Sequence, residues 1–353
     1  MSTHSAVSDN VPLNGDGPAL ELRDVEVVYE RRGRERVRAV AGASLTVERG
    51  QIVGLVGESG CGKSSLARAS VGLVPTTAGT VLFEGREVTP LTRRARPREL
   101  ARLQMVFQNP YSSLNPRRKI GSQLADALDV LGLAQSADRR GRVEELLDLV
   151  GLPASAAARY PHQFSGGQRQ RIAVARALAA DPSVLVLDEP LASLDASAQA
   201  QVANLLVDLS RRLSLSLLLI SHDLAIVRHV ADVVSVMYLG VMVETGPARS
   251  LWSLPLHPYT EALIGAVPHP DGSGLLPEAL PGEVPDPAHP PAACRFHPRC
   301  QYAFDRCSAE DPVTLEVEGD RTVACWLQAG GGPPARPAER PKPLPLLHVK
   351  DKL

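Results

Sequence analysis

Eight consecutive residues near the start of the chain have the types and order of a phosphate-binding loop. They are Gly57, Glu58, Ser59, Gly60, Cys61, Gly62, Lys63 and Ser64. The apolar run Ile52 to Val56 precedes them, and a helix-like run begins at Ser65. Glycines let the backbone curl so that its N–H groups face phosphate oxygens, and the following helix adds its positive end. Lys63 would reach the β- and γ-phosphates and Ser64 a Mg²⁺ ion. The motif predicts a nucleoside triphosphate site.

Two adjacent carboxylates end a second apolar run. Val184 to Leu187 is strand-like, and Asp188 and Glu189 follow it. Nucleotide hydrolysis needs one acid to hold Mg²⁺ and another to face the attacking water, so Asp188 is the candidate metal ligand and Glu189 the candidate base. The alternative is that a strand simply ends in polar residues at a turn before Pro190. Beside a phosphate loop, the pair favours a hydrolysis site.

A second anion site is expected between these two elements. Ser165 is a candidate helix N-cap, and Gly166, Gly167 and Gln168 follow it. A helix start explains the serine but not two successive glycines, which weaken a first turn unless something must approach the backbone closely. The exposed N-terminus of this helix therefore predicts a contact with an anion.

At this point the chain resembles the ATP-binding-cassette (ABC) ATPases, whose signature reads Leu-Ser-Gly-Gly-Gln, here with Phe164 in place of leucine. The other family positions follow in order: the adenine-stacking aromatic is Tyr29, the Q-loop glutamine Gln108, the D-loop Ala192-Ser193-Leu194-Asp195 and the switch histidine His222. Singly, Gln108 could be a turn residue, His222 a surface or core histidine and Tyr29 a packed strand aromatic. As an ordered set they imply that Gln108 and His222 position the γ-phosphate, with Gln108 also near Mg²⁺, and that Asp195 contacts the nucleotide. The D-loop order, and Ser65 where threonine is frequent, depart from the family without removing an assigned group.

The resemblance implies a dimer of two cassettes, with ATP sandwiched between the phosphate loop of one and the signature of the other. Ser165 and Gly167 would then serve the partner's nucleotide. Because the chain has one phosphate loop and one signature, it must associate to complete a site. The expected partners are a second, different ATPase subunit, two membrane permease subunits and, indirectly, an extracytoplasmic solute-binding protein.

Composition and charge restrict the class of protein. A net charge of -1 argues against a nucleic-acid binder, and the basic runs Arg31 to Arg38 and Arg93 to Arg98 are interpreted as solvated loops. The chain shows no signal peptide at Met1 and no run of about 18 apolar residues. We expect a cytoplasmic protein that other subunits bring to the inner face of the cell membrane.

Alternating strand-like and helix-like segments indicate an α/β fold with a parallel sheet. The expected strands are Val25 to Tyr29, Ile52 to Val56, Met105 to Phe107, Val184 to Leu187 and Leu217 to Ile220. The resemblance implies a P-loop ABC nucleotide-binding domain with a helical signature subdomain. We expect disorder at 1–18, the ATPase domain at 19–255, a small cysteine-containing extension at 256–330 and a disordered Pro-rich tail at 331–353.

Four cysteines lie within the Pro-rich extension: Cys294, Cys300, Cys307 and Cys325. Clustered cysteines in a cytoplasmic chain favour a metal site over disulfides, but the C-x5-C-x6-C-x17-C spacing lacks the C-x2-C pairs of most structural zinc sites. The segment is poor in apolar residues and far along the chain from the nucleotide motifs. A metal centre here is therefore expected to be structural, with the nucleotide site unaffected by its loss.

The extension resembles that of the oligopeptide/dipeptide importer subfamily, through residues 257–263, 280–285 and 294–300. That resemblance implies a [4Fe-4S] cluster on the four cysteines; zinc, with His297 a lesser candidate ligand, and unligated thiols are the alternatives. Residues 106–116 carry the same likeness and resemble the F-type ATPase of such importers. The implied function is ATP hydrolysis that powers peptide import. The alternatives are import of nickel or glutathione, a soluble cassette ATPase acting on ribosomes or DNA, and a regulatory module without turnover.

Overall fold

The computed structural model describes residues 17–30, 36–92, 97–109, 113–131, 138–267, 280 and 282–329. The predicted disordered ends, 1–18 and 331–353, lie outside these residues except for Gly17 and Pro18. Much of the two basic runs and part of the 106–116 segment also lie outside them.

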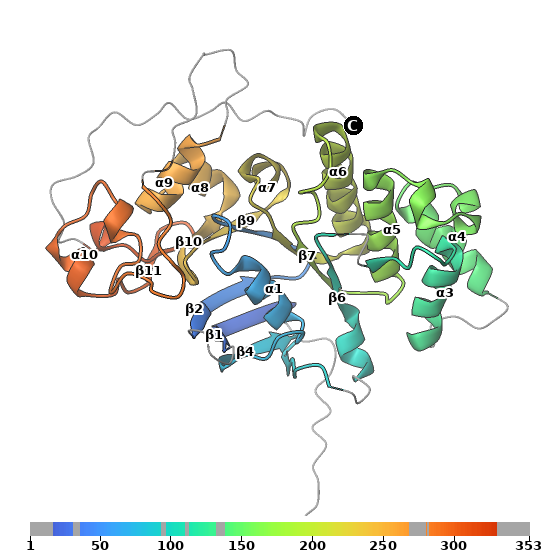
Figure 1. The fold of residues 1–353 in the computed structure, drawn as a ribbon, viewed down its shortest axis with the longest axis horizontal. Coiled ribbons are helices and arrows are strands. Elements are labelled where there is room, and N and C mark those ends of the chain that lie inside the picture. The colour runs from blue at the N-terminus through green and yellow to red at the C-terminus, as the bar shows by residue number, and fades with distance from the viewer. Residues whose placement is uncertain are drawn as a thin grey trace, which may run out of the picture.

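An eight-stranded sheet forms the centre of the molecule, in the order β11-β12-β10-β9-β3-β8-β7-β6 (Figure 1). The strands are β3 (Ile52–Val56), β6 (Leu103–Val106), β7 (Val184–Asp188), β8 (Ser216–Ile220), β9 (Val233–Tyr238), β10 (Val241–Pro247), β11 (Leu315–Val317) and β12 (Arg321–Val323). From β9 to β6 the pairing is parallel, as predicted, and from β9 to β11 it is antiparallel. Every residue of β3, β7 and β8 is buried, which is typical of a sheet covered on both faces.

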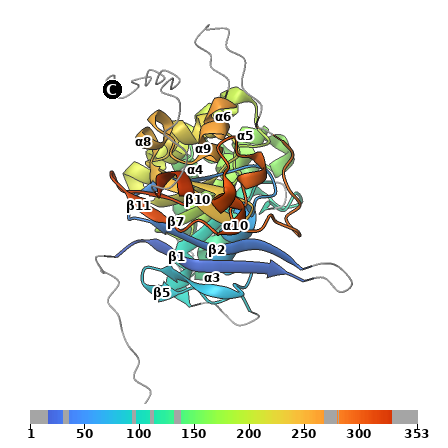
Figure 2. The same ribbon diagram turned by 90° about the vertical axis from the view of Figure 1, so that its left-hand side faces the viewer.

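A second, antiparallel sheet lies beneath the first (Figure 2). It has the order β2-β1-β4-β5, with β1 (Leu20–Tyr29), β2 (Val37–Val47), β4 (Ala78–Phe83) and β5 (Arg86–Glu87). The prediction that placed Val25 to Tyr29 in the parallel sheet is therefore wrong. In β1, buried and exposed residues alternate over much of the strand, because one face packs on the core and the other faces solvent.

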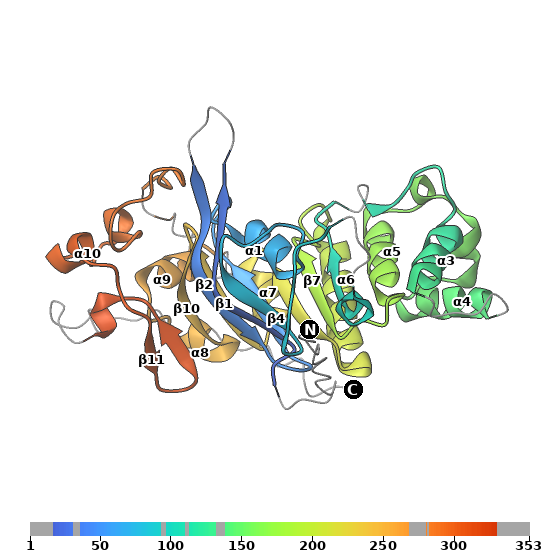
Figure 3. The ribbon, with the colours of Figure 1, turned by 90° about the horizontal axis from the view of Figure 1, so that it is seen from below.

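Helices pack on both faces of the large sheet and extend from its ends. They are α1 (Lys63–Ser70), α3 (Ile120–Leu131), α4 (Arg139–Leu149), α5 (Gly166–Leu178), α6 (Ala196–Leu213), α7 (Leu224–Val230), α8 (Ala248–Ser253), α9 (Pro258–Gly265) and α10 (Asp305–Ala309). Of these, α1 lies on the side of the antiparallel sheet. Short 3₁₀ turns are η1 (Arg98–Arg102), η2 (Ala154–Ala158), η3 (Pro161–Gln163), η4 (His297–Arg299) and η5 (Trp326–Gln328). The helices α3, α4 and α5 form an arm at the end opposite the C-terminal extension (Figures 1 and 3). This arm matches the expected helical subdomain.

The pleat of the large sheet divides the core in two. Val53 and Leu55 of β3 pack toward the antiparallel sheet and α1, whereas Ile52 and Val56 pack toward the helices. Both groups of side chains are buried, so the sheet is rigid at the strand ends where the predicted site residues begin. In the part of the chain that the structure describes, we find no helix with the length and apolarity to cross a bilayer.

The C-terminal extension is built onto this core. Its strand β12 pairs with β10, and β11 continues the sheet at that edge. Phe296 and Trp326 are buried, although the sequence predicts few core residues in this segment. The extension thus shares the core of the ATPase domain.

Candidate functional site

The phosphate-binding loop connects β3 to α1, the strand-loop-helix context that the sequence predicts. Its backbone requires glycine at two positions. Gly57 has φ 154° and Gly62 has φ 108°, and an added Cβ would lie 2.1 Å from the carbonyl oxygen of Met237 or of Ala39, respectively. Only a residue without a side chain fits there, so the loop can curl tightly before α1 begins at Lys63.

Lys63 lies inside the curled loop. Its side chain is buried, and Nζ donates to the carbonyl oxygens of Gly57 and Glu58, each at 2.8 Å. These bonds hold the ammonium group against the backbone that would surround a triphosphate. Phosphate oxygens can attract the same group, because it is a compact charge on a flexible stem.

A candidate Mg²⁺ site lies beside the loop. Ser64 donates its hydroxyl hydrogen to Oδ1 of Asp188 at 2.7 Å, and Arg68 lies 4.0 Å from Oδ2. Asp188 is 2% exposed; burial raises the pKa of its carboxyl, while the hydrogen bond from Ser64 and the charge of Arg68 act in the opposite direction. A hydroxyl and a carboxylate are hard oxygen ligands of the kind that Mg²⁺ prefers, so these residues fit the ion.

Three predicted catalytic residues meet at one oxygen atom. Gln108 donates from Nε2 to Oε2 of Glu189 at 2.8 Å, and Nδ1 of His222 lies 3.4 Å from the same oxygen. The three follow β6, β7 and β8, which are neighbours in the sheet with parallel pairing. Their carboxyl ends therefore lie at one edge, which is why residues far apart in sequence converge. Glu189 adopts the left-handed conformation with φ 46°, a strained backbone typical of functional sites.

The predicted adenine-stacking residue also reaches the loop. Tyr29 is 38% exposed at the end of β1, and its hydroxyl lies 3.2 Å from the hydroxyl of Ser65. Its ring can therefore present a face to a ligand that enters above α1.

The signature segment begins α5 as predicted. Ser165 caps the helix by accepting from the backbone N–H of Gln168, whose side chain accepts from the backbone N–H of Ser165. A Cβ on Gly167 would lie 3.1 Å from Ala198, so the signature packs against the start of α6, where Asp195 is the N-cap. The helix α5 lies apart from α1 in Figures 1 and 3. One chain therefore does not bring its signature onto its own phosphate loop.

The four cysteines of the extension lie near one another, but they are not arranged as the ligands of a metal. Burial raises the pKa of the Cys325 thiol to about 12, and the charges of Cys294, Cys300 and Cys307 contribute in the same direction. The backbone N–H of Cys294 donates to the carbonyl oxygen of Cys307 at 3.1 Å. Among the described residues, however, no group of three or more His, Cys, Asp or Glu side chains is placed to hold a metal ion. The iron–sulfur prediction is not confirmed.

The extension is far along the chain from the nucleotide motifs, yet it contacts the phosphate loop. Arg299 forms two hydrogen bonds with the Glu58 carboxylate, at 2.7 and 3.0 Å, although 241 positions separate the two residues. Tyr259 accepts a hydrogen bond from the backbone N–H of Glu58 at 2.8 Å. The sequence motifs assign no role to Arg299 or Tyr259. The signal that could indicate them is Glu58 itself, a carboxylate in an anion-binding loop that requires a counter-charge.

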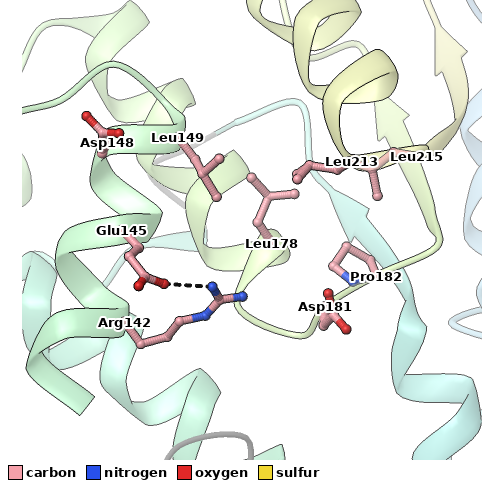
Figure 4. A pocket seen from close by; sticks show the side chains of 9 residues that line it. All are labelled: Arg142, Glu145, Asp148, Leu149, Leu178, Asp181, Pro182, Leu213 and Leu215. Carbon is pink, nitrogen blue, oxygen red and sulfur yellow. Dashed lines mark hydrogen bonds and ion pairs between the residues drawn. The ribbon is translucent and has the colours of Figure 1, made fainter. Parts of the chain in front are cut away.

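A cavity of about 370 Å³ lies elsewhere, between the helical arm and the sheet (Figure 4). Arg142 and Glu145 of α4 line it and form an ion pair of 2.8 Å with each other. It also touches Pro182 and Leu215, which precede β7 and β8. It therefore lies at the amino ends of these strands, the opposite edge from Glu189 and His222, and belongs to a different part of the molecule from the nucleotide site.

Comparisons with known proteins agree with this geometry. Residues 40–192 match the family model described as ABC transporter, and residues 243–307 match the model described as oligopeptide/dipeptide transporter, C-terminal region. A di/tripeptide transport ATP-binding protein, DppF, of Pseudomonas aeruginosa (strain UCBPP-PA14) is 50% identical over 315 residues, which cover 87% of this chain and 96% of that protein.

Two solved structures are similar in fold. The cbiO1 subunit of the cbiONQ ABC transporter complex from Clostridium perfringens has a TM-score of 0.58 and 24% identity, covering 67% of this chain and 91% of that one. A dimeric ATP-binding cassette bound to ADP and Pi has a TM-score of 0.57 and 26% identity, covering 65% and 98%. This chain therefore belongs to the ATP-binding proteins of ABC transporters, in the group that carries the oligopeptide/dipeptide transporter C-terminal region.

Proposed function

We propose that the chain hydrolyses ATP to power an importer of di- or oligopeptides. The observation that supports this most directly is the convergence of Gln108, Glu189 and His222 beside the phosphate loop, in a chain that also carries the oligopeptide/dipeptide C-terminal region. The name of the Pseudomonas aeruginosa relative points to the same class of substrate.

In the proposed hydrolysis reaction, each of these side chains has a separate role. Glu189 accepts a hydrogen bond from the attacking water and polarises it, while Gln108 and His222 orient the carboxylate and sense the γ-phosphate. Lys63 and the N–H groups of the loop bind the phosphates. Ser64 and Asp188 would hold Mg²⁺, which would neutralise charge on the nucleotide phosphates. Tyr29 stacks on the adenine ring.

In this proposal, a second cassette completes the nucleotide site across a dimer. Ser165 is exposed at the start of α5, and this helix lies apart from α1 of the same chain (Figure 1). A second ATPase subunit, of a different sequence in this proposal, presents its signature to this phosphate loop and receives Ser165, Gly167 and Asp195 in return. Closure of the two cassettes on ATP and their reopening after hydrolysis drive two permease subunits, which hold the chain at the cytoplasmic face of the membrane. An extracytoplasmic binding protein delivers the substrate.

The four cysteines complete the proposal. They hold a [4Fe-4S] cluster, with zinc as the alternative, and this group stabilises the extension. Four sulfur donors in one neighbourhood support the assignment. Anaerobically purified protein should be brown, with about four irons for the chain. Colourless protein with one zinc per chain would show that the cysteines bind zinc and not an iron–sulfur cluster. Metal-free protein would contradict both assignments.

The transport function is tested by reconstitution. The chain, its partner ATPase and the permease in liposomes should import a labelled dipeptide only with ATP inside and with the binding protein outside. Glu189→Gln should stop uptake. If the same vesicles import nickel or glutathione but no peptide, the substrate assignment fails while the ATPase assignment stands.

A further inference from the structure

Glu58 creates an electrostatic problem at the nucleotide site. It lies in the phosphate loop, and its own backbone carbonyl oxygen accepts a hydrogen bond from the Lys63 ammonium group at 2.8 Å. An uncompensated negative charge in this loop would repel a triphosphate, and this repulsion is strong where protein replaces water. Something must therefore neutralise Glu58.

The compensating charge comes from the C-terminal extension. Arg299 ends the 3₁₀ turn η4, and its two terminal nitrogens donate to the two carboxylate oxygens of Glu58 at 2.7 and 3.0 Å. The side chains are 4% and 17% exposed. This bidentate pair also raises the pKa of Arg299, so the guanidinium remains charged.

Buried aromatic rings fix Arg299 in this position. Its guanidinium donates to the hydroxyl of Tyr238 at 3.3 Å and lies 5.9 Å from the centre of the Phe296 ring. The Tyr259 ring lies 4.6 Å from that of Tyr238 and 5.3 Å from that of Phe296. Since Tyr259 also accepts from the backbone N–H of Glu58, this cluster holds both the side chain and the backbone of that loop residue.

We propose that Arg299 is a positioning residue for the nucleotide site: it cancels the charge of Glu58 and holds the first half of the phosphate loop open for a triphosphate. The extension is thus a working part of the nucleotide site. This inference rests on the proposed ATPase function, because it assigns Arg299 an effect on ATP binding.

The test is a double-mutant cycle in the full-length chain. Arg299→Met should weaken MgATP binding about tenfold, because Glu58 keeps its charge without a partner. Glu58→Gln should bind MgATP more tightly than the unaltered chain, because the charge of Arg299 is then no longer offset. The MgATP affinity of the double variant, Glu58→Gln with Arg299→Met, should return to within about threefold of that of the unaltered chain, since no charge then needs cancelling. The MgATP affinity of Arg299→Lys should lie between those of the unaltered chain and Arg299→Met, because lysine keeps the charge but not the bidentate geometry.

A kinetic readout separates positioning from a general structural role. In the reconstituted transporter, Arg299→Met should raise the KM for ATP and leave kcat within about twofold, because the contact acts on bound phosphates throughout the reaction. The control is Arg306→Met, which breaks an exposed ion pair with Glu310 on the same extension and should leave both constants unchanged.

Three results would overturn the inference. Folded Arg299→Met protein with unaltered MgATP affinity shows that the charge pair has no effect on the nucleotide. A double variant as weak as Arg299→Met shows that the arginine acts through folding alone, and so does an equal loss in Arg306→Met. Failure of the unaltered chain to bind MgATP would instead contradict the proposed ATPase function, so the two failures are distinguishable.

Discussion

At the scale of single residues, the hydrolysis site is a set of side chains held by one another. Gln108 and His222 share one oxygen of Glu189, and Ser64 is bonded to Asp188. Each carboxylate is thus oriented before a nucleotide arrives, which lowers the cost of ordering the site. Asp188 is buried and Glu189 is half-buried, so substitutions of the two acids are expected to differ in their effect on stability.

Glu189→Gln should retain ATP binding and reduce turnover by about 10²- to 10⁴-fold, because it removes a general base and leaves the phosphate contacts intact. Lys63→Ala should instead weaken binding itself, since its charge contacts the ground-state phosphates. Steady-state hydrolysis by the reconstituted transporter and MgATP titration measure the two effects. Glu87→Gln, an exposed change on β5, is the control. Near-normal turnover of Glu189→Gln would remove this residue from the role of base.

Asp188→Asn should abolish Mg²⁺-dependent hydrolysis but stabilise the folded chain at neutral pH. Burial raises the pKa of Asp188 above its ordinary value of 3.8. Between the unfolded and the raised folded pKa, the native state binds more protons than the unfolded state, so stability falls as pH rises through this window. Asparagine lacks this dependence. Urea unfolding of both proteins at acidic and neutral pH checks the sign: the advantage of asparagine should grow as pH rises, and an advantage that shrinks would contradict the argument.

At the scale of elements, strand ends and helix starts place the functional groups. The carboxyl ends of β6, β7 and β8 gather the hydrolysis residues, whereas α1 and α5 present the phosphate loop and the signature at their N-termini. The extension joins this arrangement twice, through Arg299 to the phosphate loop and through Arg321 to β10. The Arg321–Glu244 pair is the more deeply buried of the two, with side chains 6% and 0% exposed.

Arg321→Met should loosen the extension and lower the free energy of unfolding by about 3–5 kcal/mol, the usual cost of breaking a buried ion pair by removing one partner. Glu244 also accepts hydrogen bonds from the backbone N–H groups of Leu256 and His257, so its unpaired charge would remain buried. Limited proteolysis should then cut the β11–β12 segment more rapidly. Arg306→Met, which removes an exposed pair with Glu310 and a contact with the Trp326 ring, should have a much smaller effect on both measurements. Unaltered stability of Arg321→Met would mean that pairing of β12 with β10 suffices to hold the extension.

At the scale of the whole molecule, the two halves of an ATP sandwich lie in different parts of the chain. The helical arm carries the signature at one end of the molecule, and the phosphate loop lies near its centre, on the side of the extension (Figures 1 and 3). The solved cassette with ADP and Pi, similar in fold, is a dimer. In this chain the signature lies apart from the phosphate loop, so the proposed ATP sandwich needs a second cassette.

The isolated chain should therefore hydrolyse ATP slowly when it is monomeric, and the rate should rise when the partner ATPase and permease are added. Ser165→Ala on this chain should affect the site built on the partner's phosphate loop and leave MgATP binding to this chain unchanged. Light scattering at assay concentration establishes the monomer. A monomeric sample that hydrolyses ATP at the rate of the complete transporter would contradict the sandwich arrangement.

The sequence by itself indicated the phosphate loop, the signature and the proposed hydrolysis residues, because each needs a particular residue type within a short local pattern. Gly57 and Gly62, the carboxylates at the end of β7 and the cap at Ser165 are local requirements of backbone geometry and phosphate chemistry. The parallel pairing of the central strands also follows from continuous apolar runs such as Val184 to Leu187. These features could be predicted without knowing what any residue contacts.

Only the tertiary structure decided what depends on distant packing. Val25 to Tyr29 has the composition of a strand, but its place in a separate antiparallel sheet depends on its partners, β2 and β4. The spacing of the cysteines similarly indicates a shared site without fixing the distances between thiols. Arg299 reaches Glu58 because β9, α9 and the extension bury Tyr238, Tyr259 and Phe296 together. No local pattern reports such a contact, because the charge on Glu58 and the charge that cancels it meet only after the core between them has formed.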